Sequence, residues 1–224
     1  MNEALSLLLT GDAELYRIIA RTLVISSIAT ALAMMAGIPV GYALARRRFP
    51  GRTLLLGAVN TGMGIPPVVV GLIVWLLLTR SGPLGSLSLI YTKEAMVLAQ
   101  FVIATPLVVG FTAASVQSLP AELPDLLYML GAGRLRRLRI IASEARLSLL
   151  AAIMAGFGAI VSEVGASMTV GGNLRGSTRV LTTAIVTETG RGNLPVALAL
   201  GLLLLALAFT VNLLLTVVQQ RQRS

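Results

Sequence analysis

The sequence contains no cysteine and no histidine, and few of its residues are charged. These two absences exclude disulfides, zinc sites built from Cys and His, and acid–base chemistry that uses histidine. Charged residues make up 12% of the chain, against roughly 25% in a soluble domain. Hydrophobic residues make up 56%, and the mean hydropathy is +0.88. We therefore expect an integral membrane protein, and the absence of a basic stretch near the start predicts no cleavable signal peptide.

Five apolar stretches of this 224-residue chain are long enough to cross a bilayer, which takes about 20 helical residues. They cover residues 20–44, 57–79, 95–117, 147–170 and 195–218. The sequence therefore predicts an all-α membrane protein with about five transmembrane helices, forming a single domain over residues 1–224. Two longer connections remain, an inner loop at 118–146 and an outer segment at 171–194.

The basic residues indicate the orientation, because cytoplasmic loops carry an excess of Lys and Arg. Eleven of the eighteen Lys and Arg residues lie in loops 45–56 and 118–146 and in the C-terminal tail, and seven lie on the other side. We therefore expect the N-terminus outside, the C-terminus inside, and a multi-pass protein of the cell membrane. The net charge of +9 then reflects membrane topology rather than nucleic-acid binding.

Prolines interrupt three of the predicted spans, at Pro39, Pro66, Pro67 and Pro106. A proline in a helix frees backbone groups, which must find partners inside the protein or in a wet cavity. Small residues in the same spans also allow helices simply to pack closely. Taken together, the interruptions favour a helix bundle around a pathway over a simple anchor.

The inner loop contains a predicted short helix at residues 120–133. Pro120 and Pro124 suit a helix start, and Gly131 suits its end. Leucines follow at helical spacing on one face, at Leu123, Leu126, Leu127 and Leu130. Three partners for this face remain open: lipid headgroups, a groove on a cytoplasmic protein, and the rest of the chain.

This loop resembles the coupling loop of ABC-importer permeases of the type I fold. That family pattern runs Glu-Ala-Ala, three residues, Gly, and nine positions later Ile with Leu-Pro after it. The corresponding residues here are Asp125, Leu126, Leu127, Gly131 and Ile140, with Ala142 and Ser143 in place of Leu-Pro. The acidic start, the glycine and the isoleucine agree with the pattern, whereas the two alanines and the proline do not.

Three further segments extend the resemblance over nearly the whole chain. The segment "GIPPVVVGL" (64–72) is similar to a Pro-Pro-Val-Val segment of oxyanion permeases. The segment "SEVGASMTVGGNLRGSTRVLTTAIVTET" (162–189) resembles one found in molybdate, tungstate and sulfate permeases. With "SGPLGSLSLIYTKEAMVLAQ" (81–100), these segments look most like the tungstate permease family.

The resemblance implies a permease subunit that pairs as a homodimer, forms the translocation pathway and is not itself an enzyme. It also implies two cytoplasmic ABC ATPase subunits, which bind ATP and Mg, and an extracytoplasmic substrate-binding protein. The chain itself is expected to bind no cofactor and no metal, and it has no G-x-x-x-x-G-K-[ST] motif for ATP. Coupling to the ATPase would run through the 120–133 helix, using Asp125, Leu126, Leu127, Leu130, Gly131 and Ile140.

Candidate residues of the pathway or outer mouth follow from the same resemblance, since oxyanions are often held by neutral donors. They are Asn60, Thr61, Pro66, Pro67, Ser162, Glu163, Ser167, Thr169 and Asn173. The outer arginines Arg175, Arg179 and Arg191 either attract the anion or pair with acids such as Glu188.

Glu163 needs a separate explanation, because a carboxylate repels an anion and is costly inside a membrane. The favoured role is structural: the carboxylate pairs with an arginine or accepts backbone N–H bonds where the helix ends. A gate or pathway contact and a protonated carboxyl remain alternatives.

Molybdate or sulfate permeases of the same type are alternatives, and a stand-alone secondary carrier is a further one. A membrane enzyme is disfavoured, because the sequence has no His for HExxH and no clustered Asp motif.

Overall fold

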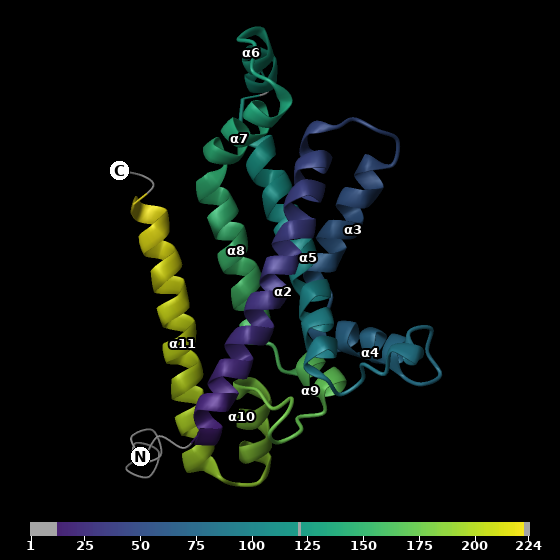
Figure 1. Ribbon diagram of the computed structural model, residues 1–224, viewed down its shortest axis with the longest axis vertical. Helices are drawn as coiled ribbons and strands as arrows, with labels where there is room; N and C mark the ends of the chain where they lie inside the picture. The colour runs from purple at the N-terminus through teal and green to yellow at the C-terminus, as the bar shows by residue number, and fades with distance from the viewer. Residues whose placement is uncertain (1–12, 121, 222–224) are drawn as a thin grey trace.

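A computed structural model describes residues 13–120 and 122–221, whose regular structure is entirely helical. Three helices are long and apolar enough to cross a membrane: α2 (Ala13–Arg46), α5 (Lys93–Gln117) and α11 (Leu194–Arg221). Two bent pairs bring the number of spans to five if each pair counts as one: α3 (Arg52–Gly64) with α4 (Pro67–Leu78), and α8 (Arg146–Val161) with α9 (Gly165–Gly171). The expected all-α membrane fold is confirmed (Figure 1).

The shorter elements lie at the two ends of the bundle. Helices α6 (Leu123–Met129) and α7 (Arg134–Glu144) lie at one end, and α10 (Leu181–Gly190) lies at the other (Figure 1). A 3-10 turn, η1 (Gly85–Leu87), lies in the loop after α4. Helix α2 begins at the α10 end of the bundle, and α11 finishes toward the α6 end. The start of the first span and the end of the last span therefore lie at opposite ends of the bundle.

The second predicted span, residues 57–79, is not one straight helix. Helix α3 starts earlier, at Arg52, and α4 turns away from it by 104° after Gly64. Ile65 is extended, with φ −66° and ψ 128°, because the ring of a following proline disfavours the helical region. Pro66 and Pro67 also lack the N–H groups that would continue the helix. The predicted inner loop 45–56 is correspondingly shorter.

The fourth predicted span, residues 147–170, is bent as well, by 59° between α8 and α9. No proline lies at this bend, which instead contains Ser162, Glu163 and Val164. By contrast, Pro39 and Pro106 lie inside α2 and α5, which continue past them. Prolines therefore mark one of the two breaks in the bundle, and Glu163 marks the other.

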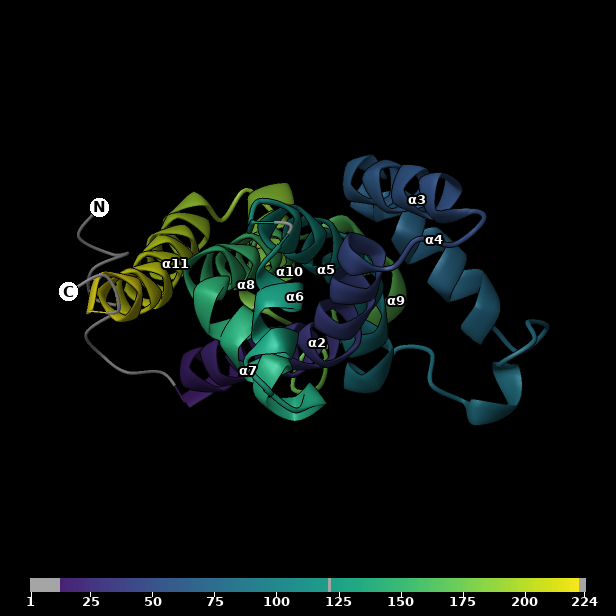
Figure 2. The same ribbon diagram turned by 90° about the horizontal axis from the view of Figure 1, so that it is seen from above.

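Helices α2 and α5 form the centre of the bundle, and α8 packs on α5. Their close approach depends on glycines of α2: a Cβ on Gly41 would lie 2.6 Å from the Val109 carbonyl oxygen. Buried alanines and isoleucines fill the contact, among them Ile25, Ala29, Ala104 and Ile160. Figure 2 shows α11 and the α3–α4 pair at opposite edges of this centre.

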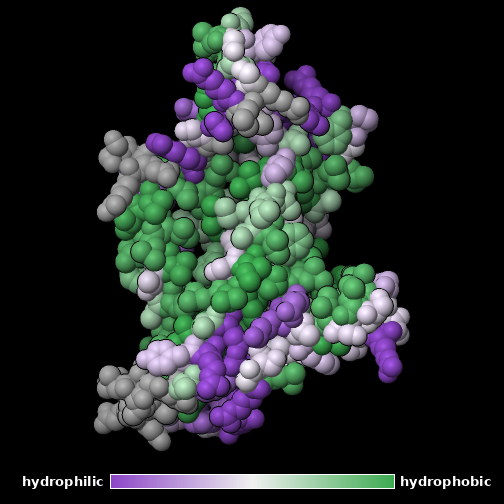
Figure 3. Space-filling model, viewed as in Figure 1, coloured by the Kyte–Doolittle hydropathy of each residue, from purple (hydrophilic) through white to green (hydrophobic). Residues whose placement is uncertain are grey.

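On the face that Figure 3 shows, apolar side chains cover the middle of the molecule, and hydrophilic residues gather toward its two ends. Large apolar side chains are exposed on α4 and α11, including Val68, Leu72, Leu198, Leu205 and Phe209. An apolar surface of this kind between polar ends is what a bilayer requires.

Candidate functional site

Glu163 caps the second helix of a broken pair. Its Oε1 accepts the Ala166 N–H at 2.8 Å, and its Oε2 accepts the Ser167 N–H at 3.0 Å. The residue is only 7% exposed, so these bonds satisfy helix-terminal N–H groups that water cannot reach. Of the roles expected for Glu163, the structure therefore shows the acceptance of backbone N–H bonds. No arginine is paired with it among the described residues.

The break at Glu163 is also tied to the outer segment. The hydroxyl of Thr182, in α10, donates to the Glu163 carbonyl oxygen at 2.9 Å, and Thr182 is buried. The carbonyl that the bend leaves free is thus satisfied inside the protein. At the α8–α9 break, both the side chain and the backbone carbonyl of Glu163 therefore have hydrogen-bond partners.

A buried polar chain links the same helix to the centre of the bundle. Ser26 Oγ of α2 donates to Gln100 Oε1 of α5 at 3.1 Å, and Gln100 Nε2 donates to Ser167 Oγ of α9 at 3.4 Å. All three residues are buried. Ser167 therefore belongs to an internal network rather than to an open surface. The sequence reasoning missed Gln100, although an amide within an apolar span signals such a partnership.

The two broken spans pack against each other through small residues. A Cβ on Gly71 of α4 would lie 2.5 Å from the Ala166 Cα of α9, and one on Gly165 would overlap the Val68 side chain. Val68 and Gly165 each lie two residues beyond a break. The Pro66 break and the Glu163 break are consequently brought close together.

The remaining predicted pathway residues differ in the hydrogen-bond donors they offer. The hydroxyls of Ser162 and Thr169 donate to carbonyls of their own chain, Gly158 O at 2.8 Å and Gly165 O at 2.7 Å. Asn60 and Thr61 are exposed on α3, close to the break, and their side chains make no hydrogen bond within the described residues. Pro66 and Pro67 are exposed beside them. Free neutral donors therefore lie on the α3 side of the break.

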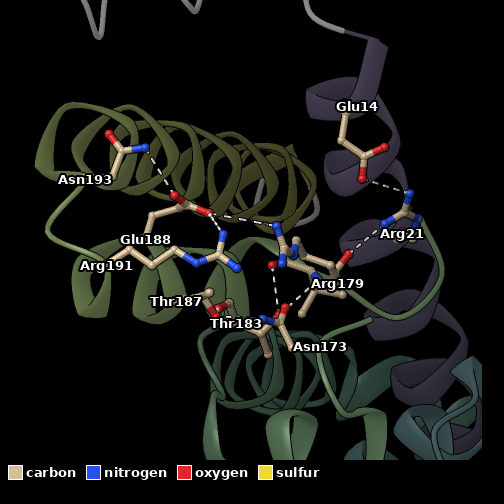
Figure 4. Close-up of polar contacts among 10 residues, drawn as sticks. Glu14, Arg21, Asn173, Arg179, Thr183, Thr187, Glu188, Arg191 and Asn193 are labelled. Atoms are coloured by element: carbon tan, nitrogen blue, oxygen red, sulfur yellow. Dashed lines mark hydrogen bonds and ion pairs between the residues drawn. The ribbon is translucent and has the colours of Figure 1, made fainter. Parts of the chain in front are cut away.

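Ion pairs organise the outer segment (Figure 4). Glu188 accepts from Arg191 at 3.1 Å and from Asn193 at 3.2 Å, and lies 3.8 Å from Arg179. Arg21 of α2 donates to the Arg179 carbonyl oxygen at 3.0 Å.

The expected pairing with Glu188 is therefore observed for Arg179 and Arg191. Arg175 is exposed and has no such pair among the described residues. Asn173 donates from Nδ2 to the Thr187 hydroxyl at 2.6 Å, which joins the loop after α9 to α10. Asn173 thus braces the outer segment from within.

The inner loop forms two helices, and its leucines do not share one face. Leu127 is buried against Val116 and Ile141, and Ile140 packs beside them. Leu126 is half exposed, and Leu130, the residue directly after α6, is 74% exposed. Leu127 and Ile140 therefore attach the loop to the bundle, and only part of the predicted stripe is left for a partner.

The tip of α6 is an exposed apolar surface. Tyr128 and Met129 are exposed with Leu126 and Leu130, and the Arg137 guanidinium lies 5.3 Å from the centre of the Tyr128 ring. Gly131 has φ +71° and ends the helix as expected, in a conformation that suits glycine. Asp125 lies within α6, and its side chain is outside the described part of the structure.

A family model matches residues 37–224 and is described as the binding-protein-dependent transport system inner membrane component. The chain belongs to this family. It is thus the permease of a multi-component system, a finding that favours such a system over the stand-alone carrier.

Curated relatives of the permease cover almost its whole length. A probable anion ABC transporter permease of Haloferax volcanii is 42% identical over 91% of each chain. The tungstate uptake system permease TupB of Peptoclostridium acidaminophilum is 37% identical, over 97% of this chain and 95% of its own. TupB of Campylobacter jejuni is 34% identical, over 94% and 88%.

Solved structures show the fold of the permease. The inward-facing MetNI methionine ABC transporter matches with a TM-score of 0.76 at 18% identity, over 93% of this chain and 95% of that one. The expected type I importer permease fold is confirmed by this match. Among the described residues, no group of His, Cys, Asp or Glu side chains could hold a metal ion.

Proposed function

We propose that the chain is the permease subunit of an ATP-driven importer for a tetrahedral oxyanion, and that the oxyanion is tungstate. The observation that carries this proposal is the near full-length similarity to two tungstate uptake permeases and to an anion permease. Molybdate and sulfate permeases are also related, over smaller parts of this chain or at lower identity. They mark the alternative substrates of the same type.

The substrate contacts are proposed at the α3–α4 break. Asn60 and Thr61 have side-chain donors that the described residues leave free, and they lie near the Pro66–Pro67 turn. Neutral donors suit an anion that must be released after it is bound, because they hold it less strongly than an arginine does. The carboxylate of Glu163 accepts the Ala166 and Ser167 N–H groups of α9, and it is not proposed as a ligand of the anion.

A second copy of the chain is proposed to close the pathway. The α3–α4 break is exposed in one chain, and Ile65, Val68 and Val69 surround it with apolar surface. Polar side chains such as Asn60 are costly to leave against lipid, so a partner copy is the surface expected to cover them. A groove of about 400 Å³ between α10 and α11 has an apolar lining, including Leu194, Leu198 and Leu202, and does not suit an anion.

The proposed coupling site is the exposed tip of α6. Leu126, Tyr128, Met129 and Leu130 would enter a groove of a cytoplasmic ATPase, which binds the ATP and Mg, one ATPase for each permease copy. Leu127 and Ile140 would transmit its movement, because they join the tip to the bundle. On the outer side, Arg175 is proposed to attract the anion where the binding protein delivers it.

The substrate assignment is tested by the partner binding protein. Isothermal titration of that protein with tungstate, molybdate, sulfate and a control amino acid would rank the ligands. We expect tungstate to bind most tightly. Tighter molybdate or sulfate binding would transfer the assignment to that anion, and binding of the amino acid alone would contradict an oxyanion permease.

A further inference from the structure

Tyr91 ends the loop between α4 and α5 in an unusual backbone conformation. Its φ angle is +62°, in the left-handed region that favours glycine. Such a conformation is costly for a bulky residue, and it persists only where the surrounding contacts hold it. The contacts of Tyr91 therefore indicate what this end of the loop does.

Two of these contacts join Tyr91 to α9. The Tyr91 N–H donates to the carbonyl oxygen of Val170, in the last turn of α9, at 2.9 Å. The Tyr91 ring lies on Gly172, where a Cβ would come within 2.7 Å of the ring atom Cδ1. Gly172 has φ +66° and directly follows α9. The end of the loop and the turn that ends α9 therefore pack against each other.

A third contact joins Tyr91 to α4. The Tyr91 hydroxyl accepts a hydrogen bond from Nε1 of Trp75, in the last turns of α4, at 3.4 Å. The loop also folds back on the same end of α4, where the Leu84 N–H donates to the Leu77 carbonyl oxygen at 2.9 Å. A single side chain thus connects the end of α4 to the end of α9.

This connection adds to the contacts between the second halves of the two broken spans. Near their starts, α4 and α9 pack through Val68 on Gly165 and through Gly71 on Ala166. Helix α4 turns 104° from α3, leaves the bundle sideways (Figure 1), and packs mainly on α9 and α5. Tyr91 therefore fixes the direction of α4 at the end that lies farthest from the α3–α4 break.

We propose that Tyr91 is a positioning residue of the permease, which clasps α4 to the end of α9 and so holds the α3–α4 break in the shape that transport requires. The clasp consists of the Tyr91 ring on Gly172 and the Tyr91 hydroxyl on Trp75. This inference rests on the proposed transport function, and Tyr91 itself does not touch the anion. Without the clasp, α4 is free to change its angle, so that fewer anions are carried for each ATP hydrolysed.

Trp75 is the only tryptophan of the chain, so acrylamide quenching of its fluorescence in the purified full-length permease reports on the clasp. Tyr91→Gly removes the side chain and suits the φ of +62°, so the backbone of the loop is kept. We expect stronger quenching in Tyr91→Gly than in the wild type. Tyr91→Phe should lie between them, because it keeps the ring on Gly172. Leu87→Ala, at an exposed position of the same loop, is the matched control and should match the wild type.

Gly172→Ala tests the other half of the clasp. Its Cβ would displace the Tyr91 ring, so this substitution alone should raise the quenching of Trp75. It should add no further rise to Tyr91→Gly, from which the ring is absent. Equal quenching in the wild type and Tyr91→Gly would overturn the clasp, and so would a full additional rise in the double variant.

The positioning role is tested in liposomes that contain the permease with its ATPase and binding protein. Tungstate accumulated per ATP hydrolysed should fall in Tyr91→Gly, recover in part in Tyr91→Phe and stay unchanged in Leu87→Ala. A merely structural role would lower the amount of assembled complex and leave this ratio unchanged. An unchanged ratio in Tyr91→Gly, with uptake by the wild type intact, would overturn the positioning role. A wild-type complex that takes up no oxyanion would instead contradict the proposed function, and the quenching of Trp75 would still decide the clasp.

Discussion

Removal of the Glu163 cap is the sharpest test of the break between α8 and α9. Glu163→Ala leaves the N–H groups of Ala166 and Ser167 without their acceptors, in a place that water does not reach. A buried unsatisfied donor costs about 1–3 kcal/mol. With two donors affected, we expect a loss of about 3 kcal/mol in the free energy of unfolding. Glu163→Gln should lose about half as much, because its amide keeps one acceptor oxygen.

The loss is measured by SDS or thermal unfolding of the purified permease in detergent. Ser162→Ala is the matched control, because Ser162 is exposed and its hydroxyl donates only to carbonyls of its own helix. The control should change stability by less than about 0.5 kcal/mol. If Glu163→Ala were as stable as Ser162→Ala, the capping role would be refuted.

Three other substitutions test the packing and the coupling tip. Gln100→Leu removes the hydrogen bonds of Gln100 with Ser26 and Ser167 and should lower the free energy of unfolding by about 1–2 kcal/mol in the same assay. No loss would show that these hydrogen bonds do not stabilise the permease. Gly71→Val should destabilise by about 1–3 kcal/mol through overlap with α9, whereas Gly57→Val, which meets open space, should cost less than about 1 kcal/mol. Leu126→Asp should abolish co-purification of the ATPase and ATP-dependent uptake while the permease stays in the membrane, and intact uptake would contradict the coupling assignment.

The sequence predicted an all-α membrane fold because its apolar runs are long and polar residues separate them, and its five spans agree with the structure if each bent pair counts as one span. It also named the prolines within three of the spans and placed Glu163 near a helix end, but it could not say which of the prolines would break a helix. Pro39 and Pro106 lie inside helices that continue past them. The helix breaks at Pro66 because a second proline follows it and because α4, after the turn, packs on small residues of α9.

The finer features of the site depended on tertiary contacts. Residue type alone allowed Glu163 to pair with an arginine or to cap a helix, and the choice required the position of the α9 backbone. The leucine stripe of the inner loop is predicted as one face, with lipid, a cytoplasmic protein or the rest of the chain as its partner. It divides because Leu127 meets Val116 and Ile141 from other helices, and no local pattern encodes that meeting.

The central proposal, an ATP-driven oxyanion permease, is tested most directly by transport. The permease is co-reconstituted into liposomes with its ATPase and loaded binding protein, and trapped tungsten is measured by mass spectrometry. We predict tungstate accumulation that requires both ATP and the binding protein and that falls sharply in Asn60→Leu/Thr61→Val, with the complex still assembled. Tungstate uptake by the permease alone without ATP, or no oxyanion uptake by the complete complex, would contradict the account.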